Sequence, residues 1–174
     1  FLNGEYLGHH QGGSTPFCLE LTAHLKADNL LQICVNNERS VQRLPGRNTD
    51  WFNYGGLYRD VELLRLPASF IHHAAIYLVP DGSFSSIKAE VEVNRGVEAA
   101  SEEIVYLSIP ELNISEKSPV LEGRAEFTVK CHPELWSPEN PKLYECFITY
   151  QEDTIQDRVG FRQIVTRGTE LLLN

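Results

Sequence analysis

Short apolar runs, separated by turn residues, are the feature that most limits how this chain can fold. The clearest run is Ile87–Val93, in which apolar and charged residues alternate strictly, so that the apolar side chains share one face. Glu90 and Glu92 then lie on the opposite, solvated face. Turn sequences such as Pro80-Asp81-Gly82 separate the runs. The chain is therefore predicted to be all-β.

The remaining predicted strands are short and rich in β-branched or aromatic residues, which favour extended structure. They are Leu30–Val35, Val61–Leu66, Ala75–Val79, Ile104–Ile109, Ala125–Lys130, Leu143–Tyr150 and Val159–Val165. A last strand is expected within Gly168–Asn174, leading into a further part of the protein.

A domain boundary is predicted at Pro67-Ala68-Ser69, where a strand ends and a new series begins. Residues 68–167 hold six or seven strands in about one hundred residues, the size of an immunoglobulin-like β-sandwich. Tyr144 precedes Cys146 by two residues, as in the tyrosine corner of that fold. Trp136 does not lie between two suitably spaced cysteines, so an antibody-type core is not expected.

Residues 1–67 hold about four predicted strands, too few for a two-layer sandwich. This segment is therefore expected to be the second half of a sandwich whose first strands lie upstream. We accordingly expect the chain to be a piece of a longer protein.

The formal net charge of −9 argues against a nucleic-acid partner or an anionic membrane surface, because both require clustered Lys and Arg. No apolar run approaches the roughly 20 residues that cross a bilayer. A soluble protein is expected, with the cytoplasm, the periplasm and secretion all left open.

Neither the cysteines nor the histidines are spaced like metal ligands. Buried free thiols are the favoured interpretation of the four cysteines, and a Cys131–Cys146 disulfide stays open for a secreted protein. His9 and His10 are adjacent and would face opposite sides of a strand. No metal, no other cofactor and no catalytic residue is predicted in this chain.

The stretch Asn48–Val61 combines an acid, four aromatic residues, a Gly pair and an Arg at the entrance of a predicted strand. Aromatic faces beside Asp50 would suit a sugar, whose apolar faces stack on rings while its hydroxyls donate to a carboxylate. The structural alternatives are that Asp50 caps a turn and that the rings pack against another layer. Gly55 and Gly56 predict a positive φ or a close approach of the backbone.

Three separated segments resemble glycoside hydrolase family 2, which contains retaining β-galactosidases, β-glucuronidases and β-mannosidases. They are residues 3–17, Asp50–Val61, and Leu135–Tyr144 together with Arg158–Ile164. Their order and spacing cover nearly the whole chain.

The resemblance implies a partial jelly-roll sugar-binding domain over residues 1–67, then an immunoglobulin-like sandwich over 68–167. Residues 168–174 would begin the link to a (β/α)₈ barrel, which carries the catalytic glutamates in this family. The implied function is the non-catalytic part of a retaining β-glycosidase that hydrolyses terminal β-linked sugars, either glucuronides or galactosides. The partners would be the carbohydrate and the barrel, and a homo-oligomer is left open.

Asp50 is the principal binding candidate, because the matching Asp of the family contacts the sugar or a nearby cation. Trp51, Phe52 and Tyr54 are the other substrate-binding candidates. Two alternatives stay open: a stand-alone carbohydrate-binding module that uses these three rings, and an adhesive β-sandwich. The connection from Asn37 to Asp50 is shorter than in the best-known glucuronidases, which leaves the substrate open.

Overall fold

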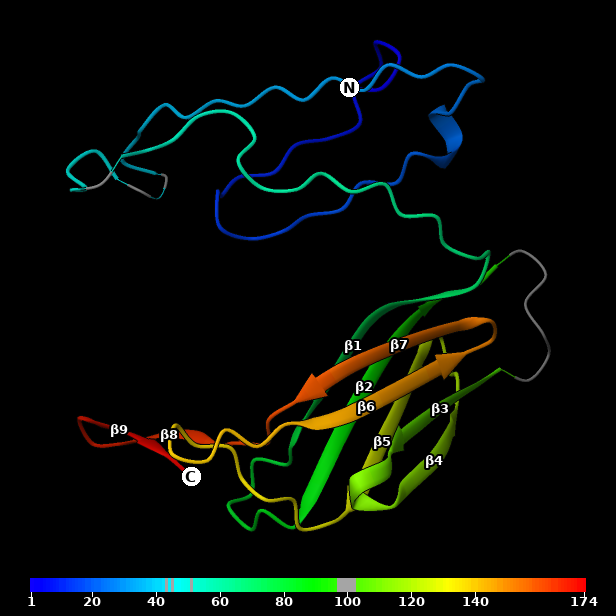
Figure 1. Ribbon diagram of the computed structural model, residues 1–174, viewed down its shortest axis with the longest axis vertical. Helices are drawn as coiled ribbons and strands as arrows, with labels where there is room; N and C mark the ends of the chain where they lie inside the picture. The colour runs from blue at the N-terminus through cyan, green and yellow to red at the C-terminus, as the bar shows by residue number, and fades with distance from the viewer. Residues whose placement is uncertain (43, 45, 51, 97–102) are drawn as a thin grey trace. The chain divides into compact units, whose positions relative to one another are not determined.

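The structure, a computed structural model, describes residues 1–42, 44, 46–50, 52–96 and 103–174. The chain divides into two compact units, residues 1–63 and residues 64–174. Figure 1 shows irregular extended segments in the first unit and strands in the second. The two helical turns of the described part of the chain have three residues each, and no helix there is long and apolar enough to cross a membrane.

The second unit is built from two antiparallel sheets and a separate hairpin (Figure 1). One sheet has the order β1-β2-β5, and the other has the order β4-β3-β6-β7. The strands are β1 (Phe70–Leu78), β2 (Ser86–Asn94), β3 (Ile104–Ile109), β4 (Ile114–Pro119), β5 (Arg124–Lys130), β6 (Tyr144–Tyr150) and β7 (Asp153–Val159). The hairpin pairs β8 (Ile164–Arg167) with β9 (Glu170–Leu173).

The alternation predicted for residues 87–93 is confirmed. In β2 every second residue is buried, and Ile87 and Ala89 are fully inaccessible to solvent. Val105 and Ile109 of β3 and Tyr150 of β6 are equally buried, so both sheets contribute to one apolar core. Burial of such side chains is the main stabilising term in a sandwich of this kind.

The charged face of β2 is solvated, as predicted, and its charges are paired. Lys88 Nζ lies 2.6 Å from Oε1 of Glu90 and 3.3 Å from Oε2 of Glu126 on β5. Glu92 pairs with Arg124 at 2.8 Å. The Lys88 hydrogen bond lowers the pKa of Glu90. Since these side chains are 29–70% exposed, each pair contributes little to stability.

Tyr144 makes the contact expected of a tyrosine corner. Its buried hydroxyl accepts a 2.8 Å hydrogen bond from the backbone N–H of Glu134, ten residues upstream. The ring packs against Phe161 at 5.6 Å between centroids. This contact ties the segment that precedes β6 to the core.

Two predictions for this unit needed correction, and one was confirmed. The strand β4 was not predicted, because its sequence Ile-Ser-Glu-Lys-Ser-Pro is mostly polar and gains its ladder from β3. The predicted run Val159–Val165 is interrupted: β7 ends at Val159 and β8 begins at Ile164. A strand does occur at the C-terminal end, as β9.

The first unit does not form the predicted strands. Leu31 makes an isolated bridge with Leu2, and Val61–Leu66 forms no strand in this structure. Strand propensity expresses the fit of a side chain to a half-buried pleated surface, and it does not create a ladder without a paired neighbour. The apolar side chains of both runs are accordingly exposed, including Leu30 at 62% and Leu63 at 79%.

Candidate functional site

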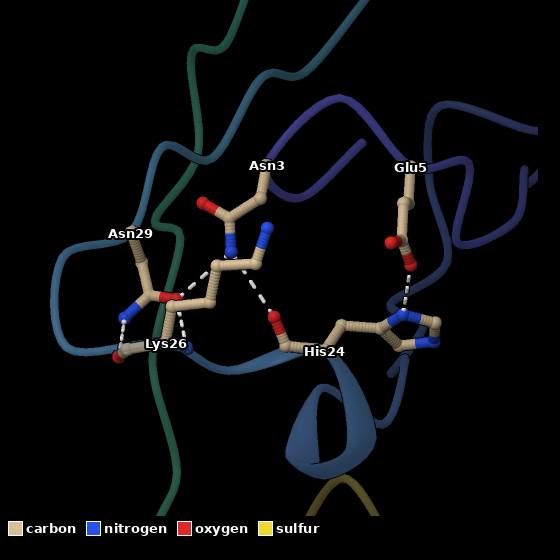
Figure 2. Close-up of polar contacts among 5 residues, drawn as sticks. All are labelled: Asn3, Glu5, His24, Lys26 and Asn29. Carbon is tan, nitrogen blue, oxygen red and sulfur yellow. Dashed lines mark hydrogen bonds and ion pairs between the residues drawn. The ribbon is translucent and has the colours of Figure 1, made fainter.

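Side-chain amides, together with backbone hydrogen bonds between residues 1–3 and 30–32, join distant segments of the first unit. Asn3 Nδ2 donates to the carbonyl of His24 at 3.0 Å and to Oδ1 of Asn29 at 3.1 Å, and its own Oδ1 accepts from the N–H of Leu30 (Figure 2). Asn29 also closes a turn through two bonds with the backbone of Lys26. One asparagine thus connects the start of the chain to residues 24–30.

Glu5 adds a charged contact to the same region. Its Oε2 lies 2.6 Å from Nδ1 of His24, and Figure 2 shows the imidazole turned toward this carboxylate. Both side chains are solvent-accessible, at 37% for His24 and 62% for Glu5. An accessible pair of this kind contributes little to the free energy of folding, and it links Glu5 to His24 locally.

Asp50 lies at the end of a turn whose two arms are joined by side chains. Between the two arms, Asn37 Nδ2 donates to the carbonyl of Asn53 at 2.9 Å, and Asn53 Nδ2 donates back to the carbonyl of Asn37 at 2.5 Å. Arg39 Nη1 donates to the carbonyl of Thr49 at 2.8 Å. The backbone on both sides of Asp50 is therefore anchored, and Asp50 itself is exposed.

The aromatic candidates beside Asp50 are exposed. Phe52 is 81% exposed and Tyr54 is 71% exposed, with 6.3 Å between their ring centroids. Trp51 lies outside the described residues. The alternative expectation was that these rings pack against another layer. In this structure Phe52 and Tyr54 are exposed instead.

Tyr58 extends this row of rings, although it was not among the predicted site residues. Its centroid lies 6.4 Å from that of Tyr54, in an edge-on arrangement. Its hydroxyl donates to the carbonyl of Gly13 at 3.3 Å, so the row is tied to the N-terminal segment. The guanidinium of Arg59 lies 6.0 Å from the Tyr58 centroid. Tyr58 follows Tyr54 by four residues in the same aromatic stretch, and this was the signal that could have identified it.

The glycine pair meets both of its expected roles. Gly56 has a φ of +80°, which L-residues rarely adopt. Gly55 is needed for close approach, because a Cβ there would lie 3.1 Å from Nδ2 and 3.2 Å from Cγ of Asn37. The glycine at position 55 therefore leaves room for the Asn37 amide.

The histidines near the N-terminus have local partners. His9 Nδ1 lies 2.8 Å from the hydroxyl of Tyr6. The ring of His10 stacks on Phe17 at 4.7 Å between centroids, and its Nε2 lies 3.1 Å from Oγ1 of Thr15. Across the described ranges, no group of three or more His, Cys, Asp or Glu side chains could hold a metal ion.

The four cysteines are free, but they are not all buried as expected. Cys18 and Cys34 are exposed, Cys131 is half-buried, and Cys146 is buried. Burial raises the pKa of the Cys146 thiol to about 11 and also raises that of Cys131. Cys18 and Cys34 are exposed because the first unit buries few side chains.

Among the described residues one carboxylate is buried, that of Glu103 in the second unit. It forms an ion pair with Arg95 and accepts a 2.5 Å hydrogen bond from the hydroxyl of Tyr150. A buried carboxylate paired in this way belongs to the interior of the sandwich and does not present itself to a substrate.

Two family models match the chain one after the other. The model described as "Glycosyl hydrolases family 2, sugar binding domain" matches residues 1–67, and the model described as "Glycosyl hydrolases family 2" matches residues 70–162. Neither match involves a stand-alone binding module or an adhesive sandwich.

Among curated proteins, the β-galactosidase large subunit of Lactobacillus acidophilus is 29% identical over all of this chain, and the β-galactosidase of Thermoanaerobacter pseudethanolicus is 28% identical over 93% of it. The matched parts are 29% and 23% of those proteins, so the chain spans less than a third of either.

Crystal structures of a GH2 β-galacturonidase from Eisenbergiella tayi, bound to glycerol or to galacturonate, superimpose on the whole chain with TM-scores of 0.71 and 0.70. The sequence identity is 27% in both, and the chain covers 32% and 33% of those structures.

Proposed function

This chain belongs to the glycosyl hydrolases family 2, and on that premise we propose that the full-length protein is a retaining β-glycosidase that hydrolyses terminal β-linked sugars. β-Glucuronides and β-galactosides are the first candidate substrates. The observation that carries this proposal is the succession of two matches to parts of one family over residues 1–67 and 70–162. The likeness to a galacturonidase that binds galacturonate adds β-galacturonides to the candidates.

The chain itself supplies the non-catalytic part of this activity. A retaining glycosidase needs two carboxyl groups about 5 Å apart across the scissile bond. We place that pair outside this chain, on a catalytic barrel that follows it. The buried carboxylate of the described residues supports this assignment, since Glu103 is already paired with Arg95 and Tyr150.

Asp50 is proposed to bind the sugar rather than to transfer protons. Its carboxylate is exposed, while the backbone of the neighbouring Thr49 and Asn53 is held by hydrogen bonds. A carboxylate accepts well from two sugar hydroxyls, and charged hydrogen bonds of this type contribute about 1.5–3 kcal/mol each. Phe52 and Tyr54 offer apolar faces nearby.

The experiment is a panel of chromogenic β-glycosides presented to the full-length protein, with glucuronide, galactoside, galacturonide and mannoside as the sugars. At least one should be hydrolysed, and proton NMR should show that the first-formed sugar keeps the β configuration. This 174-residue chain alone should hydrolyse none of them. Absence of turnover by the full-length protein on the whole panel, or an inverted first product, would overturn the proposal.

Asp50→Asn tests the binding role. The change keeps the size of the side chain and removes its charge, so KM should rise by about tenfold or more on the best substrate. Asp28→Asn is the matched control, because Asp28 is an exposed aspartate of the same unit outside the Asp50 turn. Equal KM values for the two variants would show that Asp50 does not bind the sugar.

A further inference from the structure

In the described residues between Asn37 and Asn53, the two arms of the Asp50 turn form no β-ladder, and side chains join them instead. Asn37 and Asn53, sixteen residues apart, each donate a side-chain N–H to the carbonyl of the other, at 2.9 Å and 2.5 Å. We call this reciprocal pair the amide clamp. Each asparagine fixes the other's backbone as well as its own side chain, which specifies the register of the two arms.

The turn is also fastened next to Asp50. The hydroxyl of Thr49 donates to the carbonyl of Gly46 at 2.8 Å, and the carbonyl of Thr49 accepts from Arg39 at 2.8 Å. Thr49 is half-buried, whereas Asp50 is exposed. Anchored backbone therefore lies before and after an exposed carboxylate.

Gly55 leaves the space that the Asn37 amide needs in the amide clamp. A Cβ at Gly55 would approach Nδ2 and Cγ of Asn37 to 3.1 Å and 3.2 Å, so the Asn37 amide would have to move by a few tenths of an ångström. The φ of Gly55 is not in the positive range that favours glycine, so conformational freedom does not explain the residue. Space for the Asn37 amide does.

We propose that Asn37 and Asn53 are positioning residues that hold Asp50 ready for the sugar. This inference rests on the proposed function, in which Asp50 binds the substrate. An exposed turn without the clamp would sample many backbone conformations, and binding would have to restrict them at a cost in free energy. The clamp restricts them in advance, as a preorganised site requires.

The decisive variant is Asn53→Asp in the full-length protein. The substitution is nearly isosteric but places a carboxylate oxygen, instead of an N–H donor, against the carbonyl of Asn37. KM for the best glycoside should rise about tenfold with kcat within a factor of three, because an interaction of the bound sugar is lost equally from ground state and transition state. Asn37→Asp should act in the same direction.

Asn29→Asp is the matched control. Asn29 is also an asparagine of the first unit that bonds the backbone, and it donates to the carbonyl of Lys26. In the described part of the chain its hydrogen-bond partners are Asn3 and Lys26, outside the Asp50 turn, so the KM of Asn29→Asp should match that of the unaltered protein. A KM in Asn53→Asp equal to that in Asn29→Asp overturns the proposal.

Hydrogen exchange gives a second readout that does not depend on turnover. Peptides covering residues 46–56 should exchange faster in Asn53→Asp than in Asn29→Asp, with the rest of the chain unchanged. Unchanged exchange overturns the clamp even if catalysis is affected. If the unaltered protein hydrolyses nothing on the panel, the proposed function fails and the sugar-positioning role fails with it, while exchange still decides whether the clamp orders the turn.

Gly55→Ala provides an independent approach to the same pair. The added methyl should displace the Asn37 amide and raise KM, and Asn37→Ala in the same protein should remove the clash without restoring KM. Normal KM in Gly55→Ala together with unchanged exchange over residues 46–56 would contradict the inference.

Discussion

The hydroxyl of Tyr150 donates a 2.5 Å hydrogen bond to Oε1 of Glu103, a carboxylate with only 2% of its side chain exposed. The two residues are 47 positions apart: Glu103 immediately precedes β3, and Tyr150 ends β6, its neighbour in the same sheet. Arg95 completes the group through an ion pair with Glu103. Burial of this carboxylate makes the sandwich dependent on both partners.

Tyr150→Phe should lower the free energy of unfolding of the second unit by about 1–2 kcal/mol, because it leaves the buried Glu103 without its hydroxyl donor. Urea unfolding followed by circular dichroism measures the change. Tyr106→Phe is the control: Tyr106 is 51% exposed, and its loss of a hydroxyl should change stability by less than about 0.5 kcal/mol. Equal losses in the two variants would contradict the role assigned to the Tyr150 bond.

Stability should fall at alkaline pH in a way that depends on Tyr150. Burial, and secondarily the Glu103 hydrogen bond, raise the pKa of Tyr150 to about 12, above the ordinary value of 10.0. Because the folded state holds its proton more tightly than the unfolded state, this contribution is complete below pH 10 and is lost as pH rises through 12. The unfolding free energies of the unaltered protein and Tyr150→Phe should therefore converge between pH 10 and 12. A constant difference across that range would refute the assignment.

Gly160→Ala should destabilise the second unit by about 1–3 kcal/mol through overpacking. A Cβ at this position would lie 2.9 Å from Cδ1 of Trp136 and 3.1 Å from Cδ2 of Leu143. Thermal unfolding by calorimetry measures the effect. Gly13→Ala is the comparison, since its Cβ would meet the Tyr58 hydroxyl at an ordinary 3.7 Å and should leave the melting temperature nearly unchanged. A neutral Gly160→Ala would mean that Trp136 can move aside.

The four thiols should react with Ellman's reagent at distinct rates. Cys18 and Cys34 are exposed and should react first, and half-buried Cys131 should follow. Cys146 should react only after unfolding, because it is buried and its pKa is raised to about 11, which leaves little thiolate at pH 8. Serine substitutions at Cys18 and Cys34 should remove the fast phase. Rapid labelling of Cys146 in the folded protein would contradict the described core.

Local sequence predicted the second unit well because alternation is a property of neighbouring residues. Ile87 and Val91 point to one face of any strand that contains them, whatever that strand pairs with. The same reasoning failed for β4, whose polar residues become a strand only through pairing with β3. It also failed for Leu30–Val35, where propensity was present and a ladder was not.

The sequence by itself determined the all-β class and the inward face of β2, and it predicts a sugar site in the stretch around Asp50. Only the tertiary structure decided which distant groups meet: Asn37 with Asn53, Tyr58 with Gly13, and Tyr150 with Glu103. The physical reason is that periodicity records which way a side chain points, whereas a hydrogen bond between residues 16 to 47 positions apart depends on how the chain returns on itself.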